Sequence, residues 1–204
     1  MARLLTSIVK LSRREGYALH PKAHKALLKR TTPPGQTHRN MRAKTSQYSL
    51  QLREKQKVKR LYGLLEKQFS NMMKEATKKQ GQTGEILLMN LERRLDNVVY
   101  RAGFAPSRQA ARQLTTHGHF MLNGKRVDIP SIRVSMDDSI VLRTKSTTNE
   151  YFKKLDDISP VPSIIPSWLK VNRKKIEIKI SGLPTREEAE PDINEQLIVE
   201  YYSR

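Results

Sequence analysis

Hydrophobic residues recur at helical spacing in two long stretches of the chain. Over residues 58–76 the apolar positions follow an i, i+3, i+4, i+7 pattern, which predicts one amphipathic helix of several turns. Over residues 87–102 the same spacing predicts a second helical stretch, with Thr83 as its N-cap and Gly103 just past its end. The outward face of the first helix is predicted to carry five lysines: Lys55, Lys57, Lys59, Lys67 and Lys74.

A third, shorter helix is predicted directly after Ser107, which can act as its N-cap. Its apolar residues Ala110, Ala111 and Leu114 share one face and are expected to turn inward, and Gly118 is expected to end the helix. Four polar side chains then fall on the exposed side: Arg108, Gln109, Arg112 and Gln113.

The pattern changes to β-structure after this helix. Asn123 and Gly124 lie between two short runs that contain apolar residues, which is a strong hairpin signal because both turn residues need positive φ. A turn at 136–139 leads into a strand at 140–143, and residues 176–180 alternate apolar and polar like a half-buried strand. We therefore expect a small antiparallel sheet, with the only tryptophan packed against it and not stacked on a base. The basic helix face beside a basic hairpin would form a concave surface suited to a phosphate backbone.

The two ends of the chain have weaker patterns. Residues 1–46 show no sustained periodicity and include Pro33-Pro34-Gly35, so we expect loops and short turns there. Near the C-terminus, Asp192 and Glu195 resemble an N-cap and its capping-box acid. A helix is therefore favoured over a strand for residues 197–202. Taken together, these elements predict an α+β fold.

Positive charge is in large excess and is unevenly distributed. The chain of 204 residues has 39 Lys and Arg against 20 Asp and Glu, a formal net charge of +19. Residues 1–60 contain 16 basic and 2 acidic side chains, whereas residues 181–204 contain 2 basic and 6 acidic ones. Such an excess repels itself in a compact protein unless a polyanion lies beside it, so it indicates a nucleic-acid partner. The alternative is a solvated tail without a partner.

Composition also excludes several classes. There is no cysteine, which rules out disulfides and cysteine-ligated zinc. His20 with His24, and His117 with His119, are pairs of imidazoles without further ligands, so we expect no metal and no cofactor. No apolar run approaches the roughly 20 residues that span a bilayer, and no signal peptide is recognisable, so a soluble cytoplasmic protein is expected.

Residues 93–145 resemble the S-four RNA-binding module. The resemblance lies in Arg94-Leu95-Asp96, residues 107–114, His117-Gly118-His119 and the Leu-Asn-Gly-Lys run at 122–125. Longer motifs through the rest of the chain resemble the bacterial family of small-subunit ribosomal protein S-four: residues 11–16, 33–36, 51–57, 91–101, 166–169 and 193–200.

This resemblance implies a structural protein of the small ribosomal subunit. It implies direct binding to the 5′ domain of small-subunit ribosomal RNA, an early role in assembly, and a place near the mRNA entry path. It also implies contact with protein S-five and other small-subunit proteins, through which the family affects translational accuracy. The corresponding domains are a basic extended N-terminal arm (1–46), a helical domain (47–91, completed by 183–204) and the RNA-binding domain (92–182).

Candidate contact residues follow from the charge pattern and the resemblance together. We predict contact with a protein neighbour at Glu195, Leu197, Glu200 and Tyr201. The predicted RNA-binding residues are Arg3, Arg13, Arg14, Lys22, Arg39, Arg42, Lys44, Arg53, Lys55, Lys57, Arg60, Ser107, Arg108, Gln109, Arg112, Gln113, His117, His119, Asn123, Gly124 and Lys125.

The chain departs from the family in its N-terminal region. Many members fold this region around a zinc ion held by four cysteines, and Val9 stands where the first cysteine is expected. Without thiolates no such site can form, so the chain resembles the zinc-less form. Contacts with RNA and protein are then expected to order the arm.

An enzyme is the main alternative from another class. Some pseudouridine synthases carry the same module and use an Arg-Leu-Asp motif, which Arg94-Leu95-Asp96 matches. The triplet lies on the helical stretch before the hairpin, and no further domain follows that could enclose a flipped base. We therefore expect Asp96 to pair locally with Arg93 or Arg101, and expect no enzymatic activity. Another RNA-binding protein with the same module is the remaining alternative.

Overall fold

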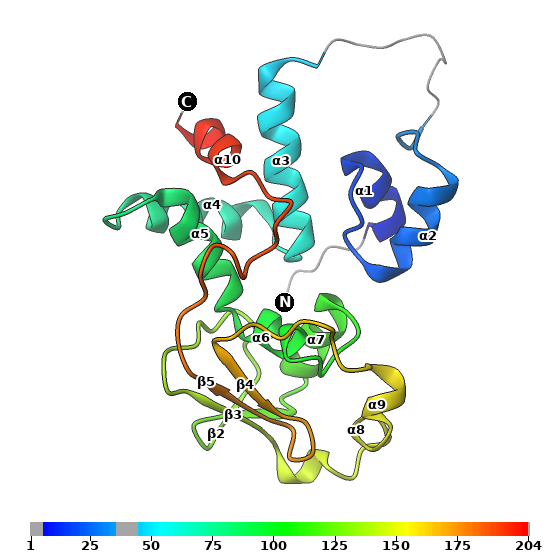
Figure 1. Cartoon of the computed structure of the whole chain (residues 1–204), viewed down its shortest axis with the longest axis vertical. Helices are drawn as coiled ribbons and strands as arrows, with labels where there is room; N and C mark the ends of the chain where they lie inside the picture. Colours follow the sequence, from blue (N-terminus) through cyan, green and yellow to red (C-terminus); the bar gives the residue numbers. More distant parts are fainter. Residues whose placement is uncertain (1–5, 36–44, 204) are drawn as a thin grey trace. The chain divides into compact units, whose positions relative to one another are not determined.

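A computed structural model describes residues 6–35 and 45–203, and the chain divides into two compact units (Figure 1). The helical unit contains residues 1–87 and 192–204, and the sheet unit contains residues 88–191. The domain boundaries drawn from the sequence, at residues 46, 91 and 182, stay a prediction. The helices of the helical unit are α1 (Ile8–Glu15), α2 (Pro21–Lys29), α3 (Gln47–Leu61), α4 (Glu66–Thr77), the first part of α5 (Thr83–Glu92) and α10 (Glu195–Tyr202).

The N-terminal region is helical, so the prediction of loops over residues 1–46 is wrong for α1 and α2. Helix α1 ends at Glu15 and is capped by Gly16, which has φ +64, and α2 begins with proline at its first position. His20 is the N-cap of α2, where its Nδ1 accepts a hydrogen bond from the backbone N–H of Lys22 at 3.0 Å. Burial and the neighbouring Lys22 lower the pKa of His20, which favours the neutral ring that this cap needs. The two helices bury only Leu11, Ser12 and Ala23 between them, too few positions to give a periodic pattern.

The predicted single helix over residues 58–76 is broken in two. Helix α3 ends at Leu61, and α4 begins after Leu65, with Gly63 between them at φ +65. Leu64 is fully buried in the break, so the connection belongs to the core. Lys55, predicted on the outward face, is only 4% exposed.

The C-terminal residues form helix α10, as predicted, and it packs on α3. Its N-cap is Asn194 and not Asp192, because the Asn194 side-chain oxygen accepts hydrogen bonds from the N–H groups of Gln196 and Leu197. Glu54 on α3 accepts the backbone N–H of Asn194 at 2.9 Å. This contact fixes the start of α10 on α3.

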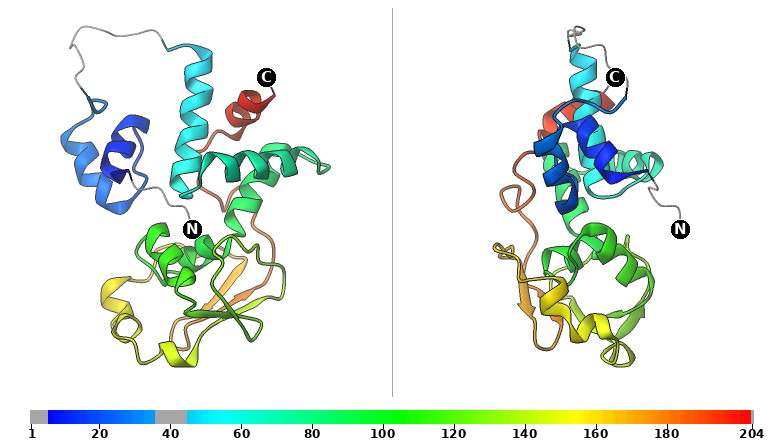
Figure 2. Two further views of the ribbon diagram at one scale, coloured as in Figure 1. Left: turned by 180° about the vertical axis from the view of Figure 1, so that it is seen from behind. Right: turned by 90° about the vertical axis from the view of Figure 1, so that its right-hand side faces the viewer.

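The sheet unit contains a five-stranded antiparallel sheet in the order β2-β1-β3-β5-β4. Figure 2 shows the ribbon of the chain from two further sides. Helices α6 and α7 pack on its inner face, where Phe104, Phe120 and Ile178 are fully buried and Trp168 is 3% exposed. The α+β class and the expected packing of Trp168 are confirmed. The elements are the end of α5, α6 (Leu95–Arg101), α7 (Arg108–Thr116), β1 (Phe120–Leu122), β2 (Lys125–Val127), β3 (Ser139–Leu142), η1 (Thr144–Ser146), α8 (Glu150–Lys153), α9 (Leu155–Ile158), β4 (Leu169–Asn172) and β5 (Glu177–Ile180).

The second predicted helical stretch is also two helices. Arg94 has extended backbone angles between α5 and α6, and the N–H of Leu95 donates to the carbonyl of Ile132 at 2.8 Å. A tertiary backbone contact therefore replaces the helical hydrogen bond at this point. Thr83 is the first helical residue of α5 instead of its cap, and Gly103, at φ +77, follows α6 as predicted.

Charged and aromatic side chains around Glu66 join α10 to α3 and α4. The Nζ atoms of Lys55 and Lys59 each lie 2.7 Å from a carboxylate oxygen of Glu66, and the Tyr202 hydroxyl donates to Glu66 at 3.0 Å. Burial by itself raises the pKa of Glu66, but the hydrogen bonds and charges of the two lysines lower it to about 2. Burial and the adjacent carboxylate raise the pKa of Tyr202.

These contacts predict how Glu66→Gln changes stability with pH. The folded-state pKa of Glu66 lies below its ordinary value of 4.5, so its stabilising effect is complete above pH 4.5 and is lost as the pH falls toward 2. We expect the variant to unfold at lower urea than the parent at pH 6, by less than about 1 kcal/mol because the side chain is half exposed, and the difference to vanish near pH 2. Glu85→Gln, at an exposed position of the same unit, is the charge-matched control. An equal difference at both pH values would contradict the assignment.

Candidate RNA-binding surface

Helix α7 exposes only part of the polar face that its sequence predicts. Ser107 caps it, with its hydroxyl accepting the Ala110 N–H at 3.2 Å, and Ala111 and Leu114 are buried. Gln109 and Gln113 are exposed, as expected. The two arginines of this face, Arg108 and Arg112, have side chains only 12% exposed.

The hairpin of β1 and β2 forms as predicted. Asn123 and Gly124 have φ values of +49 and +78, as a two-residue turn of the I′ kind requires. The Asn123 side chain is not free for a ligand: its amide nitrogen donates to Asp138 at 2.8 Å, and its oxygen accepts the Ser139 N–H at 2.9 Å. Lys125 is exposed next to this turn.

Helix α7 and the hairpin meet at Gly118. A Cβ on Gly118 would lie 2.6 Å from Nε of Arg126, so the end of the Arg126 side chain packs directly against Gly118. Arg126 is exposed and carries a positive charge close to the C-terminal end of α7. It is absent from the residues predicted to bind RNA, although it stands beside Lys125 on the same strand.

The two histidines after α7 differ in their surroundings. His117 is exposed, whereas His119 forms a hydrogen bond with Ser146 through Nδ1 at 3.0 Å. Burial, His117 and Arg143 lower the pKa of His119. We call Gln109, Gln113, His117, Lys125 and Arg126 the α7–hairpin surface.

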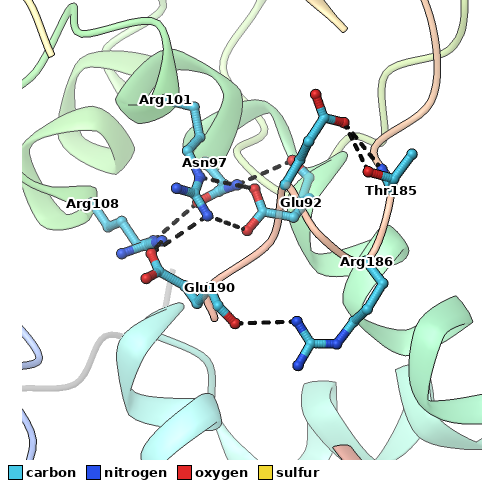
Figure 3. Close-up of polar contacts among 8 residues, drawn as sticks. Glu92, Asn97, Arg101, Arg108, Thr185, Arg186 and Glu190 are labelled. Atoms are coloured by element: carbon cyan, nitrogen blue, oxygen red, sulfur yellow. Dashed lines mark hydrogen bonds and ion pairs between the residues drawn. The ribbon is translucent and has the colours of Figure 1, made fainter. Parts of the chain in front are cut away.

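Arg108 lies in a buried network, so its predicted exposure is wrong (Figure 3). Its side chain is 12% exposed, with Nη2 2.6 Å from Glu190, Nε 3.0 Å from the Asn97 side-chain oxygen, and the guanidinium 4.6 Å from the centre of the Tyr100 ring. Arg101 binds Glu92 through Nε and Nη2, at 3.1 and 2.8 Å, and the Glu92 side chain is 1% exposed. The acid partner of Arg108 lies 82 positions away in the chain, which is why helical periodicity does not indicate it.

Arg112 is also paired, and its partner is Asp96 at 3.4 Å. Asp96 is 5% exposed and makes two further hydrogen bonds with Arg94, at 3.1 and 2.8 Å. The predicted pairing of Asp96 with Arg93 or Arg101 is wrong. The break between α5 and α6 turns Arg94 toward Asp96, whereas Arg93 donates to the backbone carbonyl of Val134. Asp96 is therefore buried between two arginines of the fold.

Several predicted RNA-binding residues of the helical unit hold that unit together. Glu15, with a side chain 1% exposed, forms ion pairs with Arg53 and Arg60. Burial raises the pKa of Glu15, and the arginines act against this shift. Arg13 donates to the carbonyls of residues 32 and 33, and Lys57 pairs with Glu54 at 2.8 Å.

The remaining predicted residues fall into three groups. Arg14 and Lys22 are exposed on α1 and α2. Lys55 lies 4.4 Å from the centre of the Tyr201 ring and pairs with Glu66. The last group, Arg3, Arg39, Arg42 and Lys44, lies outside the described residues.

The four residues predicted to contact a protein neighbour all lie on α10, and none is fully exposed. Glu200 accepts a hydrogen bond from the Gln51 side chain at 2.8 Å. Tyr201 packs on Tyr48, with ring centres 5.8 Å apart. Glu195 lies against Gly84, and Leu197 is half-buried.

Over residues 6–35 and 45–203, no group of three or more His, Asp or Glu side chains is placed to hold a metal ion. None of the helices in these ranges is both long and apolar enough to cross a membrane.

Comparison with known proteins covers the whole chain. A family model described as "Ribosomal protein S4/S9 N-terminal domain" matches residues 3–92, and one described as "S4 domain" matches residues 93–140. The "Small ribosomal subunit protein uS4" of Chlorobaculum tepidum is 52% identical over 205 residues, which cover 100% of both chains. The proteins of the same name from Pelodictyon phaeoclathratiforme and Clostridioides difficile are 51% and 49% identical, again over 100% of both chains. The chain belongs to the uS4 family.

This membership confirms the S-four family predicted from the sequence, in its cysteine-free form. The uS4 family consists of structural proteins of the small ribosomal subunit, which act in translation. The S4 domain of the chain includes α6, α7 and the β1–β2 hairpin, and therefore the whole α7–hairpin surface. Strands β4 and β5 lie beyond the matched residues.

Buried and exposed basic residues of this S4 domain should differ in how much their substitution changes stability. We expect Arg108→Lys to lower the free energy of unfolding by about 1–3 kcal/mol, because an ammonium group cannot reproduce the paired hydrogen bonds to Asn97 and Glu190. Lys125→Gln should change it by less than about 0.5 kcal/mol, since Lys125 is exposed. Urea unfolding followed by circular dichroism measures both. Equal effects would show that Arg108 is not a structural residue.

Proposed function

We propose that this chain is a primary ribosomal-RNA-binding protein, which binds the 5′ domain of small-subunit ribosomal RNA directly and nucleates assembly of the subunit. The observation that carries the proposal is the α7–hairpin surface: helix α7 and the β1–β2 hairpin of the S4 domain both expose amides or cations, and they meet where Arg126 lies against Gly118. Lys125 and Arg126 supply charge to phosphates. Gln109 and Gln113 offer donors and acceptors suited to bases and 2′-hydroxyls.

Basic residues in the N-terminal helices extend this proposal. Arg14 and Lys22 are exposed on α1 and α2 and are suited to further phosphate contacts. Arg53, Arg60, Arg108 and Arg112 instead act indirectly, by holding the helices that carry the contacts.

We also propose that the chain has no enzymatic role. The Arg-Leu-Asp triplet supports this, because its aspartate is buried and bound to two arginines. A catalytic carboxylate must reach its substrate, and this one is occupied by the fold.

The salt dependence of RNA affinity tests the proposal. The logarithm of the affinity for a 5′-domain transcript should fall linearly with the logarithm of salt concentration, by roughly 0.7–0.9 for each phosphate neutralised. Lys125→Gln should reduce this slope by the amount that corresponds to a single phosphate, whereas Lys67→Gln, at an exposed position on α4, should leave it unchanged. Filter binding at several salt concentrations gives the slopes. An affinity that does not respond to salt would exclude phosphate contact as its basis.

We further propose that the acidic C-terminal end meets protein S-five near the mRNA entry path, and that this contact contributes to translational accuracy. Repulsion between its carboxylates and phosphate keeps this end away from RNA. Glu195→Lys should therefore weaken binding to purified S-five and increase miscoding, with RNA affinity within about twofold of the parent. Thermal unfolding of the variant is the control, because Glu195 also lies against Gly84. A large loss of RNA affinity with unchanged accuracy would assign this end to the RNA site.

A further inference from the structure

The hairpin of β4 and β5 lies beyond the residues matched by the S4 domain (Figure 1). It carries a second group of basic side chains. Four of its lysines are exposed: Lys170, Lys174, Lys175 and Lys179. Strand β4 forms one edge of the sheet and β2 forms the other. The sheet therefore has a basic hairpin at each of its two edges.

These lysines are held close together with little compensation. Lys170 and Lys179 are direct cross-strand partners, an arrangement that is unfavourable for like charges in an isolated protein. One carboxylate of the hairpin, Glu177, lies 3.7 Å from Lys179, whose side chain is nevertheless 66% exposed. The fifth basic residue of the hairpin, Arg173, binds Asp156 and the carbonyl of Gly103 and is 18% exposed.

The surface between the lysines is open to solvent. A shallow groove on the hairpin is lined by Lys170, Val171, Asn172, Glu177 and Lys179. The large apolar residues of these strands, Leu169, Ile178 and Ile180, point into the core. A protein partner would need large apolar side chains at the centre of its interface, and Val171, which is half-buried, is the one apolar residue that lines this groove.

We propose that the β4–β5 hairpin is a second RNA-binding surface, which holds the phosphate backbone of an RNA segment other than the one on the α7–hairpin surface. The inference rests on the proposed RNA-binding function and extends it to residues outside the S4 domain. Each lysine supplies a point charge on a flexible stem, and the lysines at the strand positions and the turn span at most about 13 Å along the hairpin, four residues at the rise of a strand. Phosphate, which carries no sequence information, matches such a set, because the hairpin has no exposed aromatic side chain to stack on a base, and the Asn172 side-chain oxygen already accepts the N–H of Lys175.

The absence of cysteine from the chain allows a direct test. Lys175→Cys and Lys125→Cys each create one attachment site for an iron chelate that cleaves nearby RNA through hydroxyl radicals. Each labelled protein is reconstituted into small ribosomal subunits, and the cleaved nucleotides are mapped. We expect cleavage from both positions, at separate nucleotides. Cleavage from position 125 without cleavage from 175 would overturn the second surface, whereas cleavage from neither would overturn the proposed RNA-binding function.

A charge-matched pair of variants gives an independent measurement. In the hairpin variant Lys170, Lys174, Lys175 and Lys179 become Gln, and in the control variant the exposed residues Lys67, Lys74, Lys78 and Lys79 become Gln, so that both lose four charges. The hairpin variant should reduce the salt slope for reconstitution onto full-length small-subunit RNA by roughly 0.7 for each phosphate that is no longer neutralised, and the control should not. Both should retain the thermal unfolding midpoint of the parent within a few degrees. Equal slopes for the two variants would mean that net charge, and not the hairpin, sets the affinity; capture of an acidic protein with an unchanged slope would assign the hairpin to a protein partner.

Discussion

The structure depends on the pairing of a small number of carboxylates with the basic side chains around them. The chain has about two cations for each acid, and Glu15 and Glu92 have side chains only 1% exposed. A carboxylate buried without a partner costs several kcal/mol, so Glu15 requires Arg53 and Arg60, and Glu92 requires Arg101. Asp96 and Glu190 repeat the arrangement in the sheet unit, each between two arginines. The acids thereby determine which cations belong to the fold and which are left for a partner.

The difference between cations paired with buried acids and cations left exposed explains what could and could not be predicted about the candidate site. Charge and helical periodicity correctly placed Gln109, Gln113 and Lys125 on the surface. They gave the same expectation for Arg108 and Arg112, whose acid partners are separated from them by 82 and 16 positions. A pattern within one helix contains no information about such a partner. Predicted RNA-binding residues were therefore a mixture of exposed side chains and structural ones.

The predictions of secondary structure were also correct only where the signal is local in the sequence. The Ser107 cap, the turn at residues 123–124 and the strand near residues 177–180 were predicted correctly, because each signal is complete within a few residues. The break at Gly63 was missed because the apolar spacing stays in phase across it. The break at Arg94 depends on a backbone contact with residue 132, far along the chain. Helices α1 and α2 were missed because each is short and buries few residues.

The hydrogen bonds between Asn123 and residues at the start of β3 have a consequence for how the β1–β2 hairpin recognises a ligand. A two-stranded hairpin on its own is only marginally stable in water, and fixing the backbone of one residue costs about 1–2 kcal/mol of conformational entropy. Here the turn is already ordered by two side-chain hydrogen bonds to Asp138 and Ser139. Most of that entropy is lost when the protein folds, before any ligand arrives. Association then has to order little more than the side chains of Lys125 and Arg126, so the hairpin meets its ligand as a preorganised surface.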